Sequence, residues 1–246
     1  MTSDDFWRIT EAKRVETEMN IAPRFELLRT ANIEVLRKIM LQYRSFTKYY
    51  ITDLGLLVSK LPPGKMRSMI GDILYEELGS GDSEGDHLRL WDRFLLSLGI
   101  DEAVLESSAN PKNIALLEEL SRLLRKRSVG YGIGLRGMGG ECVCHVYLVR
   151  MYEFLIRNPY IRERRSEIDW RFWDIHVGEV DIRHQEMIHK AIGELIAIDP
   201  SQIENLADGY ERAMAIWWAF WANVFEEVGA SPVRQSTRAG EFSMAA

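Results

Sequence analysis

The chain has 246 residues, of which 46% are hydrophobic and 28% are charged, and its formal net charge is −6. This composition is typical of a globular protein with one large domain or two small ones. The negative charge argues against a nucleic-acid binder held by phosphate contacts, and no run of eighteen apolar residues could span a membrane. Residues 1–10, MTSDDFWRIT, are too acidic for a signal peptide, and Cys142 and Cys144 are too close in sequence to link distant parts of a fold. We therefore expect a cytoplasmic protein.

Apolar residues recur every three or four positions through most of the chain, which is the pattern of a helix with one buried face. Proline and glycine separate these stretches, as expected at helix ends. In chain order, the pattern opens after Pro23 and predicts helices over residues 25–43, 46–58, 65–79, 85–98, 110–126, 141–157, 170–198 and 201–228.

The domain organisation follows from these elements. No segment alternates apolar and polar residues between turn signals, so no strands are expected. We predict an all-α fold, a compact bundle of seven or eight helices. No repeat, linker or change of composition divides residues 21–230, which we take as a single domain. Residues 1–20 are predicted to be loosely ordered and residues 231–246 to form a flexible tail, because they have few apolar anchors.

A first group of polar residues lies where two predicted helices meet. Glu77 ends one helix and His87 begins the next, with the glycines of Gly79-Ser80-Gly81 allowing the chain to bend between them. The ordinary interpretation is a solvated helix end followed by a turn. However, apolar neighbours such as Ile73 indicate a buried helix, on which a carboxylate needs a partner. The alternative is therefore a metal-binding pair.

A second group lies in residues 171–184, which hold two histidines and several acids. Asp181 and His184 are three residues apart and share a helix face. His176 and His184 are eight apart, which leaves them about 80° out of alignment on an ideal helix. A helix irregularity near Gly178, such as a π-turn, would restore a common face. The alternative is an exposed charged helix, although its flanks are unusually apolar for that interpretation.

A third acid, Glu141, begins a helix after two glycines. Alone, it could simply interact favourably with the helix dipole. Together, the three groups offer carboxylates and imidazoles from separate helices of one bundle. Di-iron and di-manganese sites are built in this way, and open positions on iron(II) allow dioxygen to be activated.

The motifs also carry a family resemblance, which spans about residues 22–228. Besides Glu141 and the final His-x4-Asp-x2-His run, it rests on Glu77-Leu78-Gly79-Ser80-Gly81, His87-Leu88, Leu90-Trp91 and Leu98-Gly99. These resemble the haem-oxygenase-like di-iron oxidases and oxygenases, which include the CADD-like proteins. The thiaminase TenA and the PQQ-synthesis enzyme PqqC share the fold. The resemblance implies six metal ligands: Glu77, His87, Glu141, His176, Asp181 and His184.

The same resemblance implies an activity. Two Fe(II) ions, with manganese as an alternative, would use dioxygen to oxidise a small organic substrate such as an amine, amino acid or fatty acid. Glu77, Glu141 and His184 would be catalytic, and the protein would be a homodimer. The family's last motif usually reads His-x3-Asp-x2-His. The extra residue here requires either a bulge or a ligand role for Glu179.

Two other functions remain open. One is a metal-independent enzyme of cofactor metabolism, as in TenA and PqqC. The other is a CADD-like interaction protein, for which an exposed aromatic face would serve. Trp217, Trp218 and Trp221 are the relevant aromatic residues, and at helical spacing they favour core or subunit-interface packing. His189 has no predicted partner.

Overall fold

The computed structural model describes residues 1–106, 109–177 and 179–230; within these, the side chains of residues 21–22, 141–146, 179–183 and 185 are not described. All regular elements in this part of the chain are helical, which confirms the all-α prediction. They include eleven α-helices, more than the seven or eight expected. The difference comes from the helix over Ser3–Phe25, which was not expected, and from short helices at corners, which are too brief to show a periodic pattern; the predicted segments 25–43 and 46–58 belong largely to one helix, Ile33–Lys60.

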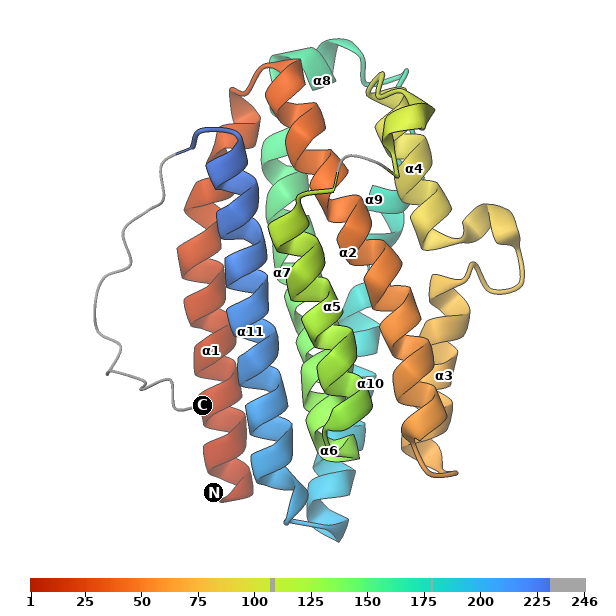
Figure 1. Ribbon diagram of the computed structural model, residues 1–246, viewed down its shortest axis with the longest axis vertical. Helices are drawn as coiled ribbons and strands as arrows, with labels where there is room; N and C mark the ends of the chain where they lie inside the picture. The colour runs from red at the N-terminus through yellow and green to blue at the C-terminus, as the bar shows by residue number, and fades with distance from the viewer. Residues whose placement is uncertain (107–108, 178, 231–246) are drawn as a thin grey trace.

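Six long helices form most of the bundle: α1 (Ser3–Phe25), α2 (Ile33–Lys60), α5 (Pro111–Lys126), α7 (Gly139–Leu155), α10 (Glu179–Ile198) and α11 (Gln202–Glu227). Helices α3 (Lys65–Glu77) and α4 (His87–Ser97) pack against α2. The short helices are α6 (Val129–Gly132), α8 (Pro159–Glu163) and α9 (Arg171–His176). Figure 1 shows α1 beside α11 on one side of the molecule and α3 and α4 on the other.

The N-terminal segment differs from the prediction. Residues 1–20 were expected to be loosely ordered, but residues 3–20 belong to α1, which is preceded by a capping box between Thr2 and Asp5. Phe6 is fully buried, and Trp7 stacks on His189 of α10 with ring centroids 3.8 Å apart. A few aromatic contacts therefore hold a helix that is otherwise polar. Pro23 lies inside the end of α1 rather than opening the next helix. The predicted tail, residues 231–246, lies outside the described residues.

Aromatic side chains fill the centre of the bundle. On α11, Trp217 stacks on Tyr147 of α7 at 4.8 Å and packs against Phe46 of α2 at 3.9 Å. Trp221 is fully buried and meets Phe25 at the end of α1. The aromatic run is thus core packing, the first of its predicted roles.

The glycine-rich stretch before Glu141 is helical as well. It forms α6, then the π-helical segment η4 (Ile133–Met138), and then α7. A Cβ at Gly134 would come within 2.1 Å of the Leu206 carbonyl oxygen on α11. Glycine is therefore required for this close approach of the two backbones.

A buried ion pair fixes η4 to α2. Arg136 of η4 and Asp53 of α2 are both almost fully buried, and the Arg136 Nε donates to the Asp53 carboxylate at 2.8 Å. The hydroxyl of Ser121 on α5 also donates to Asp53, at 2.5 Å. One network thus links three elements of the core.

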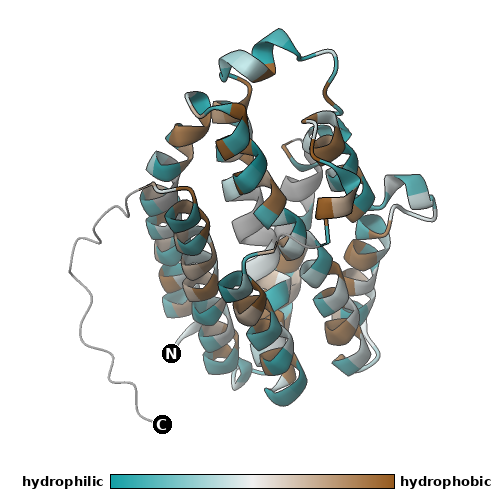
Figure 2. Cartoon of the chain, turned by 45° about the horizontal axis from the view of Figure 1, so that its top comes forward, coloured by the Kyte–Doolittle hydropathy of each residue, from teal (hydrophilic) through white to brown (hydrophobic). Residues whose placement is uncertain are grey.

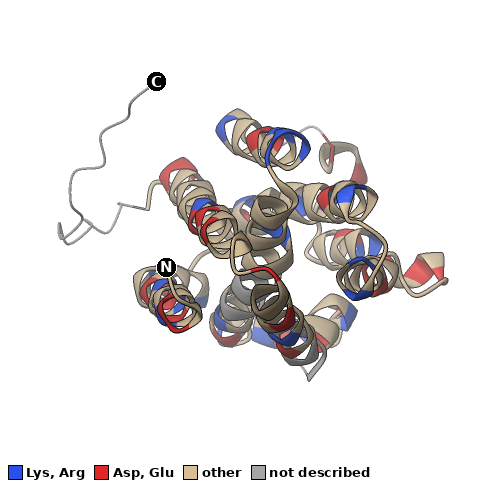
Figure 3. Ribbon diagram, turned by 90° about the horizontal axis from the view of Figure 1, so that it is seen from below, with Lys and Arg blue, Asp and Glu red and all other residues tan. Residues whose placement is uncertain are grey.

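The outer faces of the helices are polar and mixed in charge. Hydrophobic and hydrophilic residues are interspersed along each helix (Figure 2), and acidic and basic residues occur together on the helices (Figure 3). Among the described residues, no helix is long and apolar enough to cross a membrane.

The Asp53→Ala variant should lower the free energy of unfolding by about 3–5 kcal/mol, because it leaves the Arg136 charge buried without its counter-ion. Urea denaturation measures this change. Asp208→Ala, on the exposed side of α11, is the control and should cost less than about 0.5 kcal/mol. Equal, small losses in both variants would show that the buried pair contributes little.

Candidate metal centre

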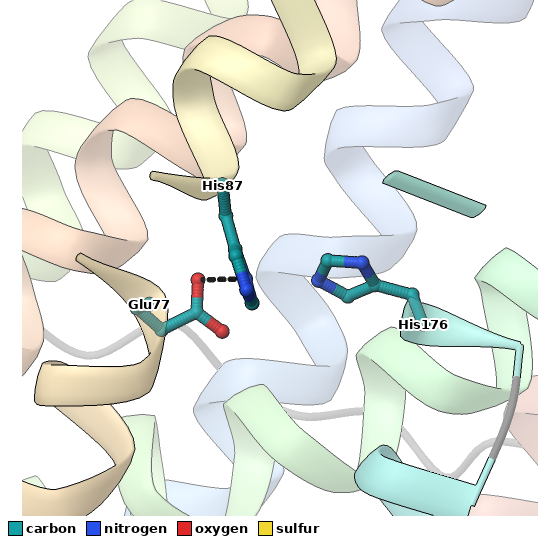
Figure 4. Close-up of side chains that lie close together, drawn as sticks. All are labelled: Glu77, His87 and His176. Carbon is teal, nitrogen blue, oxygen red and sulfur yellow. Dashed lines mark ion pairs between the residues drawn. The ribbon is translucent and has the colours of Figure 1, made fainter. Parts of the chain in front are cut away.

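Three of the predicted ligands meet inside the bundle. Glu77, His87 and His176 are each 6–7% exposed, and one ligand atom from each lies within 4.8 Å of the other two. Their side chains converge from α3, α4 and α9 (Figure 4). We call these three residues the Glu-His-His cluster.

The connection between α3 and α4 explains how Glu77 and His87 meet. Gly79 and Gly81 have positive φ angles of 86° and 91°. A Cβ at Gly79 would lie 2.1 Å from the Asp82 carbonyl oxygen, so only glycine fits this turn. The Asp86 side chain then caps α4. The turn places Nδ1 of His87 2.9 Å from Oε2 of Glu77.

His176, the last residue of α9, reaches the cluster from the opposite side. Its Nδ1 lies 2.8 Å from the carbonyl oxygen of Phe172. With the proton on Nδ1 donated to this oxygen, the far nitrogen, Nε2, keeps its lone pair. The ring stacks on Phe172 at 4.0 Å and meets the His87 ring at 4.6 Å, nearly edge-on. Its far nitrogen points toward His87 and Glu77 in Figure 4.

The environment keeps His176 neutral. Burial and, to a smaller extent, the neighbouring imidazole of His87 together lower the pKa of His176 to about 4, although the Glu77 carboxylate opposes the change. At neutral pH the imidazole is therefore uncharged and its lone pair is available to a metal.

His184 lies next to the cluster but outside it. It is 2% exposed, and its charge also acts to lower the pKa of His176. Its Nε2 lies 2.7 Å from Oε2 of Glu76 on α3. The predicted ligands Glu141 on α7 and Asp181 on α10, and the alternative Glu179, have side chains outside those described.

The predicted irregularity between His176 and Asp181 is present, in a different form. The sequence suggested one helix over residues 170–198 with a π-turn. Instead, α9 ends at His176 and α10 begins at Glu179, with Val177 in a turn between them. Gly178 itself lies outside the described residues. The break lets His176 and His184 approach the same region without helical alignment.

Sequence reasoning missed Glu76 as a partner of His184. Glu76 precedes Glu77, and consecutive helical residues point about 100° apart. With Glu77 assigned to the buried face, the sequence therefore predicts that Glu76 is exposed to solvent. The available signal was the presence of two adjacent acids, Glu76 and Glu77, at the end of one predicted helix.

In the metal-free protein, the low pKa of His176 makes stability depend on pH. The unfolded chain takes up a proton below about pH 6.5, whereas the native state does so only near pH 4. The free energy of unfolding should therefore fall by up to about 3 kcal/mol as pH drops across this interval. Urea denaturation with a chelator present measures it. His176→Gln should flatten the pH dependence, and exposed His189→Gln should not; an unchanged His176→Gln profile would contradict the assignment.

Comparisons with known proteins identify a family for this chain. A family model described as "Iron-containing redox enzyme" matches residues 38–218. The search of curated proteins gives no match.

Solved structures show the same fold. A domain of unknown function with a haem oxygenase-like fold from Shewanella denitrificans has a TM-score of 0.73 and 16% identity, covering 96% of this chain and 99% of that one. A CADD-like protein of unknown function from Nostoc punctiforme has a TM-score of 0.67 and 18% identity, covering 89% and 98%. A TenA homologue from Pyrococcus furiosus has a TM-score of 0.68 and 15% identity, covering 89% and 99%.

Proposed function

Since this chain belongs to the family of iron-containing redox enzymes and has a haem oxygenase-like fold, we propose that it is a non-haem iron oxidase or oxygenase that acts on a small organic substrate. The Glu-His-His cluster is the observation that carries the proposal. It concentrates one carboxylate and two imidazoles in a buried site, where the ring of Phe172 packs against both histidines.

The donor set suits iron(II). Two histidines and one carboxylate form the facial triad of non-haem iron(II) oxygenases, which leaves open coordination positions. His176 is already neutral at physiological pH, as ligation requires. A divalent cation would also suit the buried Glu77 carboxylate, whose Oε2 lies 2.9 Å from Nδ1 of His87.

Two groups of residues would hold the metal ions. Glu77, His87 and His176 would hold one iron, and Glu141, Asp181 and His184 would complete a second site, in which manganese is an alternative. Bound iron(II) would supply the electrons and open positions for dioxygen chemistry. Phe172 and Trp91, both buried beside the cluster, would exclude water from the reacting centre.

The substrate class stays as the family resemblance suggests: an amine, an amino acid or a fatty acid. A homodimer is likewise a prediction. The alternative of an interaction protein loses support, because it requires an exposed aromatic face. Trp217 and Trp221 are instead buried within one chain. A metal-independent activity leaves the Glu-His-His cluster without a role.

Anaerobic Fe(II) should raise the melting temperature of the protein, because the ion binds the folded cluster and not the unfolded chain. At an excess of about 100 Kd the gain is about 2.7 kcal/mol, or roughly 5–10 °C for a chain of this size. Differential scanning calorimetry measures the shift.

The matched variants decide whether this gain is specific. His87→Ala should lose most of it. His189→Ala, which changes a histidine stacked on Trp7 away from the cluster, should keep it even though its metal-free melting temperature falls. Equal responses of the two variants to Fe(II) would mean non-specific binding and would refute the proposed iron site.

A further inference from the structure

A row of aromatic rings leads from the Glu-His-His cluster to the surface. The ring of His176 stacks on Phe172 with centroids 4.0 Å apart, and Phe172 lies 4.7 Å from Trp91. Trp91 lies 5.5 Å from Trp173, and Trp173 lies 5.8 Å from Tyr152. These separations are those of aromatic rings in contact. We call Trp91, Trp173 and Tyr152 the aromatic chain.

Three helices contribute to this chain, and its last member reaches the solvent. Trp91 is on α4, Trp173 is on α9 and Tyr152 is on α7, and α9 packs against both of the other helices. Trp91 and Trp173 are fully buried, whereas Tyr152 is partly exposed. Trp170, which is also partly exposed, lies 5.9 Å from Tyr152. The chain therefore has one end beside the cluster and the other at the surface.

The members of the chain can each give up an electron. Indole and phenol rings can be oxidised by one electron, whereas a phenyl ring resists oxidation. Electron transfer becomes exponentially slower with distance, so rings in contact exchange electrons readily. Phe172 is then a short bridge between the cluster and Trp91, and the three oxidisable rings continue the path to the surface.

The two buried indoles also lack a hydrogen-bond acceptor. Among the described residues, the Nε1–H groups of Trp91 and Trp173 are buried without a partner. A buried N–H without an acceptor costs free energy and calls for an explanation, of which a redox role is one. An oxidised indole with no acceptor nearby keeps its proton, remains a strong oxidant and takes an electron from the next ring. The phenol of Tyr152 can instead release its proton to water.

We propose that the aromatic chain protects the metal centre by supplying electrons to it when dioxygen is reduced without substrate. One electron passes from Trp91, across Phe172, to the oxidised metal centre, which is thereby reduced by one electron. Trp173 then reduces Trp91, and Tyr152 reduces Trp173 as its phenolic proton passes to water. A one-electron reductant in solution, such as ascorbate, restores Tyr152, which regains its proton from water. This inference rests on the proposed function, because dioxygen must first oxidise bound iron.

The test mixes the Fe(II)-loaded full chain with dioxygen in the absence of substrate and follows organic radicals by freeze-quench electron paramagnetic resonance. The wild type should give a tyrosyl radical signal, which ring-deuterated tyrosine narrows and ascorbate removes. Trp173→Phe and Tyr152→Phe should each lose most of this signal. Peptide mass spectrometry should find more oxidation at Phe172 and His176 in both variants than in the wild type, because fewer electrons reach the metal centre.

Two controls match these changes. Trp221→Phe removes another fully buried indole, which is connected to Trp91 through Tyr43. The rings that Trp221 contacts among the described residues are all buried, so this branch gives no exit to the surface. Tyr49→Phe removes a partly exposed phenol on α2, outside the aromatic chain. Both variants should give the wild-type signal and the wild-type pattern of oxidation.

The outcomes separate this inference from the iron site itself. If the wild type binds Fe(II) but gives no tyrosyl signal, or if Trp173→Phe gives the same signal as Trp221→Phe, the inference is wrong while the iron site stands. If the wild type takes up no Fe(II), the proposed function fails, and this inference fails with it. Metal-free melting temperatures show whether Trp173→Phe folds. Should it not fold, Tyr152→Phe decides, since it loses only a hydroxyl group: a signal equal to that of Tyr49→Phe would overturn the proposal.

Discussion

Polar groups buried in an aromatic core need partners, and this requirement organises the centre of the molecule. Glu77, His87 and His176 are enclosed by helices whose other inward residues are largely hydrophobic. Leaving a carboxylate and two imidazoles unpaired there would cost several kcal/mol. Two contacts offset part of this free-energy cost: the one between Glu77 and His87, and the one between His176 and the Phe172 carbonyl oxygen.

The backbone places each member of the cluster at the end of a helix. Glu77 ends α3, His87 begins α4 and His176 ends α9. At helix ends the chain changes direction, so side chains from three helices can converge at one point without requiring those helices to be parallel. The glycine turn at 79–81 and the break after His176 are the two local features that make this convergence possible.

Features of the fold and of the site could be predicted from the sequence where neighbouring residues determine them, and not where contacts distant in sequence do. Helical periodicity identified the long helices other than α1, and the glycines between Glu77 and His87 indicated that these residues could meet. The order of residues 1–20 was not predictable from composition, because it depends on Phe6 burial and on Trp7 stacking on a residue 182 positions away. Glu76 was missed for the same reason, since its partner His184 lies on another helix. The π-segment depends on close packing against α11, which no local pattern reveals.

The central claim is that the Glu-His-His cluster binds iron. Anomalous diffraction at the iron absorption edge, from crystals grown anaerobically with Fe(II), tests it most directly. The account predicts an anomalous peak at bonding distance from donor atoms of Glu77, His87 and His176. Fully loaded crystals with no peak at these three residues, or with iron bound only at surface acids, would contradict it.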